Sequence, residues 1–153
     1  MNLTSVPDII DSFKDEYEKF SNFYPVLIHF EGMNFQSVEH AYVASKTKDR
    51  MIRQMISKLD ASEAGKAKML GRKLILREDW HIIKIALMKK FLMEKYLYKE
   101  FKDFLLSTGN SQLIEGNHWH DNYWGNCYCK KCCNVVGQNN LGKILMKIRD
   151  TIK

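Results

Sequence analysis

The stretch "SVEHAYVASK", residues 37–46, marks the point at which the chain changes from strand-like to helical sequence. Apolar and small residues recur there at steps of three and four, at Val38, Ala41 and Tyr42. This is the period of an α-helix that is packed on one side. Ser37 stands just ahead of these residues and is a suitable N-cap. We therefore expect a helix to begin after Ser37.

The sequence before this helix predicts a small β-sheet. "DIIDSF", residues 8–13, and "VLIHF", residues 26–30, are short, apolar and strand-like. "SNFYP", residues 21–25, is typical of a turn, and Gly32 interrupts a hairpin-sized loop before "MNF", residues 33–35. Short apolar runs bounded by such residues indicate strands and hairpins.

The sequence after this helix is mainly helical. Periodic apolar residues predict helices at about residues 48–59, 61–71, 78–95 and 98–107, and a closing amphipathic helix in "NNLGKILMKIRDTIK", residues 139–153. The chain is irregular between Gly109 and that last helix. We expect an α+β fold, a single compact and mainly helical domain with a small N-terminal β-sheet.

Composition and punctuation favour one domain over residues 1–153. Of the 153 residues 45% are hydrophobic, which is enough material for a single core. Pro7 and Pro25 are the only prolines, and the sequence has neither a Gly/Ser linker nor an internal repeat.

The chain is basic, with 24 Lys and Arg against 18 Asp and Glu and a formal net charge of +6. The basic residues are spread through helical stretches such as "KTKDRMIRQMISK" and do not form a tail. This distribution is typical of a solvated basic face and favours an anionic ligand only weakly. The sequence has no arginine-rich arm and no familiar nucleic-acid-binding module.

The sequence predicts no association with a membrane. The first residues, "MNLTSVPDIIDSFKDEYEKF", carry acids and lack the long apolar run of a signal peptide. No later stretch approaches the run of about eighteen apolar residues that a membrane span needs. We expect a cytoplasmic protein, in which cysteines are normally reduced.

A first group of candidate site residues lies on the helix that opens at Ser37. Glu39 falls in its first turn, where the positive end of the helix dipole stabilises a carboxylate. Lys46 follows two turns later on the same face, with Tyr42 between them. The row is either a catalytic set or a capping Glu and a Lys that both face solvent, and the spacing alone favours the solvated pair.

A second candidate lies in "LIEGNHWHDNYWG", residues 113–125. Asp121 and Trp124 fall in a segment too rich in Asn, His and Gly to be a regular element, and loops often carry function. Asp121 is therefore a site candidate, but an aspartate that only caps its own turn fits equally well.

The third candidate is the cysteine-rich stretch "HWHDNYWGNCYCKKCC", residues 118–133. A zinc ion could be bound by Cys127, Cys129, Cys132 and Cys133, with His118 and His120 as further ligands. Structural zinc sites usually take two ligands from each of two knuckles that are well separated in sequence, whereas these cysteines fall within seven residues. Free thiols on a loop are the favoured interpretation, and a zinc-bearing interaction domain is the alternative.

Taken together, these motifs resemble the NADAR family, small N-glycosidases linked to NAD and ADP-ribose metabolism. The resemblance extends over nearly the whole chain and rests on nine motifs in order. They are "SNFYP" at 21–25, "EG" at 31–32, "SVEHAYVASK" at 37–46, "REDW" at 77–80, "MKKF" at 88–91, "LLSTG" at 105–109, "LIE" at 113–115, "DNYWG" at 121–125 and "GQNNLGKILMKIR" at 137–149. Two features depart from the family pattern, namely Phe20 where Leu is frequent and a longer loop around Asp121.

The resemblance implies that Glu39 and Asp121 are the catalytic carboxylates of a hydrolase that acts on N-glycosyl compounds. It implies substrate contacts from Asn22, Lys46, Trp80, Trp124 and Asn139. Cleavage of a ribosyl N-glycosidic bond passes through an oxocarbenium-like state, so one carboxylate would activate water and the other would assist the departing nitrogen. We expect no cofactor.

The resemblance also leaves two substrates open, a phosphoribosylamino-pyrimidine intermediate of riboflavin synthesis and ADP-ribose on a guanine base. The expected partners are accordingly a small phosphoribosyl or ADP-ribosyl substrate, or ADP-ribosylated nucleic acid. The alternative function is a binding module that recognises ADP-ribose or a nucleotide without hydrolysis. Such a module needs no catalytic carboxylate, so the presence of Glu39 and Asp121 favours the enzyme.

Overall fold

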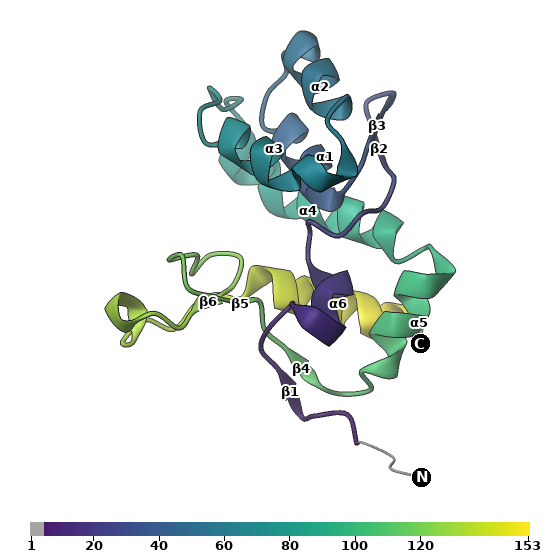
Figure 1. The fold of residues 1–153 in the computed structure, drawn as a ribbon, viewed down its shortest axis with the longest axis vertical. Coiled ribbons are helices and arrows are strands. Elements are labelled where there is room, and N and C mark those ends of the chain that lie inside the picture. Colours follow the sequence, from purple (N-terminus) through teal and green to yellow (C-terminus); the bar gives the residue numbers. More distant parts are fainter. Residues whose placement is uncertain (1–4) are drawn as a thin grey trace. The chain divides into compact units, whose positions relative to one another are not determined.

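A computed structural model describes residues 5–153, which form two compact units (Figure 1). The middle unit is Ser21–Tyr98, and the terminal unit combines the described chain up to Phe20 with Lys99–Lys153. Each unit has its own core and is described by itself. The single domain expected from the sequence stays a prediction.

The middle unit is built around one buried helix. Its elements are β2 (Ile28–Phe30), β3 (Met33–Phe35), α1 (Val38–Ser45), α2 (Arg50–Ser57), the 3₁₀ turn η2 (Ala61–Glu63), α3 (Ala64–Gly71) and α4 (Trp80–Lys95). All eight residues of α1 are buried, and α1 contacts α2, α3, α4 and both strands of the hairpin. Figure 1 shows α1 among these helices. A residue on α1 is therefore held on every side by packing.

The start of α1 is fixed by the predicted N-cap. The hydroxyl of Ser37 accepts a hydrogen bond from the backbone N–H of His40 at 3.2 Å and lies 2.7 Å from Nδ1 of the same residue. Nε2 of His40 lies 3.1 Å from the carbonyl oxygen of Asp60. Burial lowers the pKa of the His40 imidazole. The prediction of a helix after Ser37 is confirmed.

The terminal unit joins the two ends of the chain. Its elements are β1 (Ile9–Ile10), the 3₁₀ helix η1 (Asp15–Phe20), α5 (Lys99–Ser107), β4 (Gln112–Leu113), β5 (Gly116–Asn117), β6 (Asn126–Cys127), the 3₁₀ turn η3 (Lys130–Cys132) and α6 (Asn140–Ile152). β1 pairs in parallel with β4, and β5 pairs in parallel with β6. Its core includes Phe13, Phe20 and the inner face of α6. The loop between β5 and β6 is thus closed at its base by a strand pair.

The α+β class and the hairpin are confirmed. β2 and β3 pair in antiparallel register, and Gly32 between them has a φ of +74°. Residues 15–20, for which the sequence predicted no element, form a 3₁₀ helix. The ring centroid of Phe20 in this helix lies 4.8 Å from that of Phe104 in α5.

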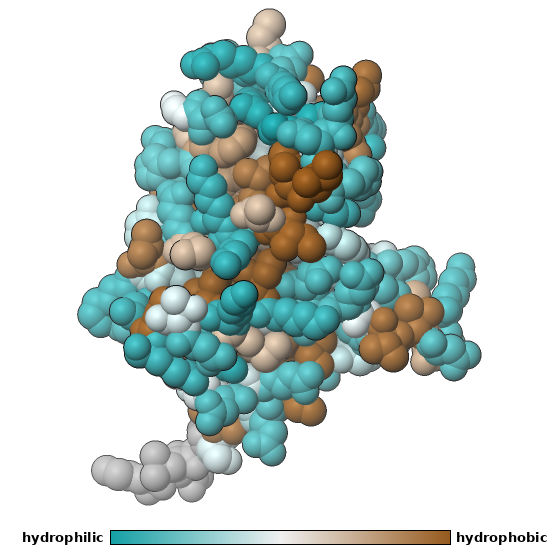
Figure 2. Space-filling view, turned by 180° about the vertical axis from the view of Figure 1, so that it is seen from behind, coloured by the Kyte–Doolittle hydropathy of each residue, from teal (hydrophilic) through white to brown (hydrophobic). Residues whose placement is uncertain are grey.

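No helix in residues 5–153 combines the length and apolar character needed to cross a membrane. The face in Figure 2 is largely hydrophilic, with separate hydrophobic patches. The most exposed large apolar side chains include Ile75, Ile82 and Val136.

Candidate functional site

Glu39 occupies the first turn of α1 and is almost fully buried. Its side chain is 9% exposed, and its backbone N–H donates to the carbonyl oxygen of Asn22 at 3.0 Å. The "SNF" turn therefore lies against the N-terminal end of α1, where the helix dipole favours a negative charge. Glu39 is not a freely solvated capping residue.

Lys46 and two aromatic rings share this region of the middle unit. Nζ of Lys46 lies 5.3 Å from the ring centroid of Tyr42, and that ring lies 5.1 Å from the ring of Trp80 at an interplanar angle of 54°. Burial is the main cause that lowers the pKa of Lys46, and the charge of Glu39 opposes it. Tyr42 thus links Lys46 to Trp80, and Glu39 lies close enough for its charge to act on Lys46.

Further cations act on Lys46. The charges of Lys68, Arg72 and Lys84 each lower its pKa, which means that positive potential accumulates around its ammonium group. The absence of a side chain at Gly71 leaves room for Val43 and Lys46, because a Cβ at that position would lie 3.0 Å from a methyl group of Val43 and 3.4 Å from Nζ of Lys46. An anionic group placed here would relieve the repulsion among these cations.

Asn22 offers a polar atom in the same unit. Its Oδ1 is buried and accepts no hydrogen bond from residues 5–153, while its Nδ2 lies 3.5 Å from the sulfur of Met88. A buried acceptor of this kind normally has a partner. Its position beside Glu39 suits it to receive a hydrogen bond from a bound molecule.

Lys95 supports the turn that carries Asn22, and sequence reasoning missed it. The side chain is fully buried at the end of α4, and its Nζ donates to the carbonyl oxygen of Ser21 at 2.9 Å. Burial lowers the pKa of Lys95 to about 7. The signal was present in the sequence, since Lys95 continues the apolar stripe of Met88, Phe91 and Leu92 at helical spacing.

Asp121 lies on the loop between β5 and β6 in the terminal unit. Its Oδ1 accepts hydrogen bonds from the backbone N–H groups of Tyr123 at 3.1 Å and Trp124 at 2.8 Å. Within residues 5–153, Oδ2 accepts no hydrogen bond. The carboxylate therefore caps its own turn with one oxygen and leaves the other for a water molecule or a ligand.

Asn117, which the sequence did not single out, holds the Asp121 loop. It is 1% exposed, its Nδ2 donates to the carbonyl oxygen of Asp121 at 2.7 Å, and its Oδ1 accepts from the N–H of Asp121 at 3.1 Å. Oδ1 also accepts from the N–H of Trp119. The buried side-chain amide of Asn117 thus binds backbone groups of the loop that have no partner in a helix or strand.

Trp124 lies on this loop, and Asn139 lies directly before α6. The ring of Trp124 packs edge-on against Tyr123, with centroids 5.0 Å apart. Asn139 has a φ of +49° and is largely buried; its Oδ1 accepts from the N–H of Glu115 and its Nδ2 donates to the carbonyl oxygen of Leu113. These contacts give Asn139 a positioning role before α6, and its predicted contact with substrate stays a prediction.

The comparisons with known proteins agree with the family resemblance that the sequence motifs indicated. A family model described as the NADAR domain matches residues 10–153. The chain belongs to the NADAR family. The similarity to known relatives covers both units of the chain.

Two curated relatives and one solved structure illustrate the similarity. An N-glycosidase of Nostoc punctiforme is 36% identical over 143 residues, covering 90% of this chain and 86% of the relative. A riboflavin biosynthesis protein of Vibrio vulnificus is 34% identical over 143 residues, covering 91% of this chain and 37% of that longer protein. The NMR structure of the E. coli protein YbiA matches with a TM-score of 0.80 at 30% identity, covering 99% of this chain and 89% of YbiA.

The predicted site residues of this NADAR chain fall into two sets. Asn22, Glu39, Lys46 and Trp80 belong to the middle unit, and Asp121, Trp124 and Asn139 belong to the terminal unit. Their roles in catalysis and binding stay predictions.

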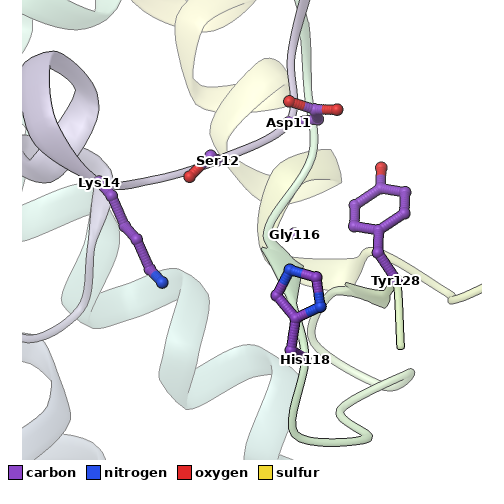
Figure 3. Close-up of a pocket in the computed structure, with 6 residues that line it drawn as sticks. All are labelled: Asp11, Ser12, Lys14, Gly116, His118 and Tyr128. Carbon is purple, nitrogen blue, oxygen red and sulfur yellow. The ribbon is translucent and has the colours of Figure 1, made fainter. Parts of the chain in front are cut away.

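A small cavity lies in the terminal unit, and none of these seven residues lines it. It has a volume of about 210 Å³ and is lined by Asp11, Ser12, Lys14, Gly116, His118 and Tyr128. Figure 3 shows Lys14 on one side and His118 and Tyr128 on the other. Pockets for drug-sized ligands measure about 300–1,000 Å³, so this cavity is too small for a nucleotide.

The cysteine-rich stretch gathers a different set of ligands from the one considered from the sequence. His120, Cys127, Cys129 and Cys132 place one potential metal-binding atom each within 4.8 Å of one another. Cys133 is exposed and lies outside this group. Among the described residues this is the group that could hold a metal ion.

Proposed function

We propose that this NADAR protein is a hydrolase that cleaves a ribosyl N-glycosidic bond, with Glu39 and Asp121 as catalytic carboxylates. The observation that carries the proposal is the burial of Glu39 beside Lys46, whose ammonium group is surrounded by further cations. This reaction requires a carboxylate near the cationic sugar, and an ammonium group beside it would bind a phosphate on the substrate. The names of the curated relatives support the same class of reaction.

The properties of each carboxylate suit a part of this chemistry. The transition state carries positive charge near the anomeric carbon, and a nearby carboxylate stabilises it. Asp121 has one oxygen fixed by two backbone N–H groups and the second available, as a residue that orients a water molecule needs. Glu39 is shielded from solvent, which strengthens its interaction with charge on the sugar.

Binding residues follow from the same contacts. Lys46 would pair with a phosphate of the substrate, because an anion lowers the mutual repulsion of Lys46, Lys68 and Arg72. The indole of Trp80, which packs on Tyr42, would cover the sugar or the base. Oδ1 of Asn22 would accept a hydrogen bond from a sugar hydroxyl. We also propose that the reaction takes place in the cytoplasm.

A phosphoribosylamino-pyrimidine is the first candidate substrate. It has one phosphate for Lys46 and a compact base for the aromatic rings. Its support is the name of the Vibrio vulnificus relative, a riboflavin biosynthesis protein.

ADP-ribose on a guanine base is the second candidate. Its pyrophosphate carries two negative charges, about as many as a phosphate monoester near pH 7, and the cations around Lys46 are compatible with it. The net charge of +6 is also compatible with a nucleic-acid substrate.

The decisive experiment offers both substrates to the purified full chain in separate reactions. Released base and sugar are measured by mass spectrometry, with Glu39→Gln as the inactive variant and Glu100→Gln, an exposed position on α5, as the matched control. Release from one substrate by wild type and the control, but not by Glu39→Gln, is expected. Binding of both without release from either would support the non-catalytic ADP-ribose-binding alternative.

A further inference from the structure

Four side chains with metal-binding atoms converge beside the Asp121 loop. Nδ1 of His120 lies 3.3 Å from Sγ of Cys129 and 3.3 Å from Sγ of Cys132. Sγ of Cys127 belongs to the same group, in which all four atoms lie within 4.8 Å of one another. Cys127 and Cys132 are buried, and Cys129 is partly buried. All four residues belong to the terminal unit, so the cluster is formed within one compact body.

These separations match a tetrahedral metal centre. Zn²⁺ binds sulfur at about 2.3 Å and nitrogen at about 2.0–2.1 Å, so ligand atoms at the corners of a tetrahedron lie about 3.4–3.8 Å apart. The separations of 3.3 Å and the limit of 4.8 Å bracket that range. Three thiolates and one imidazole are a ligand set that selects zinc among the common ions.

The backbone around the cluster is arranged as in a ligated site. The N–H of His120 donates to Sγ of Cys127 at 3.3 Å, and such bonds stabilise a metal-bound thiolate. The N–H of Cys132 donates to the carbonyl oxygen of Cys129 at 3.0 Å, which closes the turn of the C-x-x-C motif. Pairing of β5 with β6 brings Cys127 next to the loop that carries His120.

We propose that His120, Cys127, Cys129 and Cys132 bind one structural zinc ion. Four protein ligands leave no open coordination position, so the ion supports the fold and does not activate water. Cys133, which follows directly on Cys132, is exposed and stays a free thiol.

The proposed zinc ion lies next to the loop that carries Asp121. Its ligand His120 immediately precedes Asp121, and the N–H of its ligand Cys127 donates to Oδ1 of Asn122 at 2.9 Å. Zinc would therefore tie His120, and with it the neighbouring Asp121, to Cys127 at the end of β6 and to the turn at Cys129 and Cys132 that follows. This inference rests on the contacts of the cluster and holds whether or not the chain is an N-glycosidase.

The experiment measures zinc and thiol reactivity in the purified full chain, prepared with a phosphine reductant and without chelators. Elemental analysis is expected to give about one zinc ion per chain. Cys133→Ser is expected to keep that zinc, whereas Cys129→Ser and Cys132→Ser lose most of it. With native wild type, an alkylating reagent is expected to modify Cys133 alone, and all four cysteines after the metal has been removed.

A second measurement does not depend on the folding of variants. Replacement of the metal in wild type by Co²⁺ is expected to give the thiolate charge-transfer and strong visible bands of a tetrahedral site. Wild type that is folded and reduced but takes up no Zn²⁺ in competition with a chromogenic chelator would overturn the proposal. So would rapid alkylation of Cys127, Cys129 and Cys132 in the zinc-treated protein, or a disulfide among them in the reduced preparation.

Discussion

The two predicted catalytic carboxylates are held by different means. Glu39 lies on α1, whose eight residues are all buried and which is surrounded by helices and a hairpin. Asp121 lies on a loop whose backbone is held by the amide of Asn117 and by the turn that Asp121 itself caps. Many packing contacts hold α1 in place, whereas a few hydrogen bonds hold the Asp121 loop. Substitutions should therefore be local in effect on α1 and disruptive in the loop.

Removal of the negative charge of Glu39 or of Asp121 should have the largest effect on activity. Glu39→Gln and Asp121→Asn should each lower kcat at least about 100-fold, the lower range for general acid-base groups. Asn at position 121 keeps an oxygen for the N–H groups of Tyr123 and Trp124, so the loop should survive. Steady-state rates on a ribosyl substrate and circular dichroism are the measurements.

The matched control for the loop variant is Asp150→Asn, which removes an exposed carboxylate from α6. It should keep wild-type rates. Near wild-type turnover by both Glu39→Gln and Asp121→Asn would show that these carboxylates do not carry the reaction.

Removal of the amide of Asn117 should have the next largest effect. Asn117→Ala leaves the N–H and carbonyl groups of Asp121 without their partners, and each unsatisfied buried group costs about 1–3 kcal/mol. We expect a loss of about 2–3 kcal/mol in the free energy of unfolding of the terminal unit. Hydrogen exchange of the backbone N–H groups of Trp119 and Asp121 measures it directly.

Asn110→Ala is the control, because Asn110 is an exposed loop residue whose change should stay within about 0.5 kcal/mol. Unchanged exchange at Asp121 in Asn117→Ala would mean that other contacts hold the loop.

The same contrast explains what the sequence could predict. Helices α1, α4 and α6 were found within a few residues because periodic apolar positions reflect packing on one side. Strands β1 and β4 have two residues each and pair across about a hundred positions, so no local pattern marks their partner.

The candidate site was predictable to a similar extent. Residues that recur in family motifs were identifiable, whereas Asn117 was not, because an Asn in a polar loop has no pattern that distinguishes it. All four residues of the proposed zinc site were among the candidates from the sequence, but their spacing did not show which four of the six would converge. His120 replaces Cys133 in the cluster because the strand pair β5–β6 folds the loop back, which counting residues cannot reveal.

The buried lysine of the middle unit should make its stability depend on pH. The pKa of Lys95 is about 7 in the folded protein, below the ordinary value of 10.5, so between these values the unfolded chain binds the extra proton. The free energy of unfolding should therefore rise with pH from about 7 to 10.5, by at most about 1.4 kcal/mol per pH unit. Below pH 7 both states are protonated and this slope disappears.

Urea unfolding gives the free energy of unfolding of wild type and of Lys95→Met at each pH between 7 and 10.5. The value for wild type minus the value for Lys95→Met should increase with pH. The same subtraction with Lys102→Met, which changes an exposed lysine on α5, should give no such increase. A difference that is flat between pH 7 and 10.5 would mean that Lys95 keeps its proton when buried.

Loss of the N-cap of α1 should have the smallest effect. Ser37→Ala removes the acceptor for the N–H of His40 and should cost about 1 kcal/mol of unfolding free energy, the usual value for an N-cap. Because α1 is packed on every side, Glu39 should stay in place and kcat should fall less than threefold. Ser107→Ala, an exposed serine at the end of α5, is the control for both urea unfolding and kinetics. A loss of activity from Ser37→Ala as large as that from Glu39→Gln would mean that the cap, and not the surrounding core, positions the carboxylate, and the contrast between helix and loop would then fail.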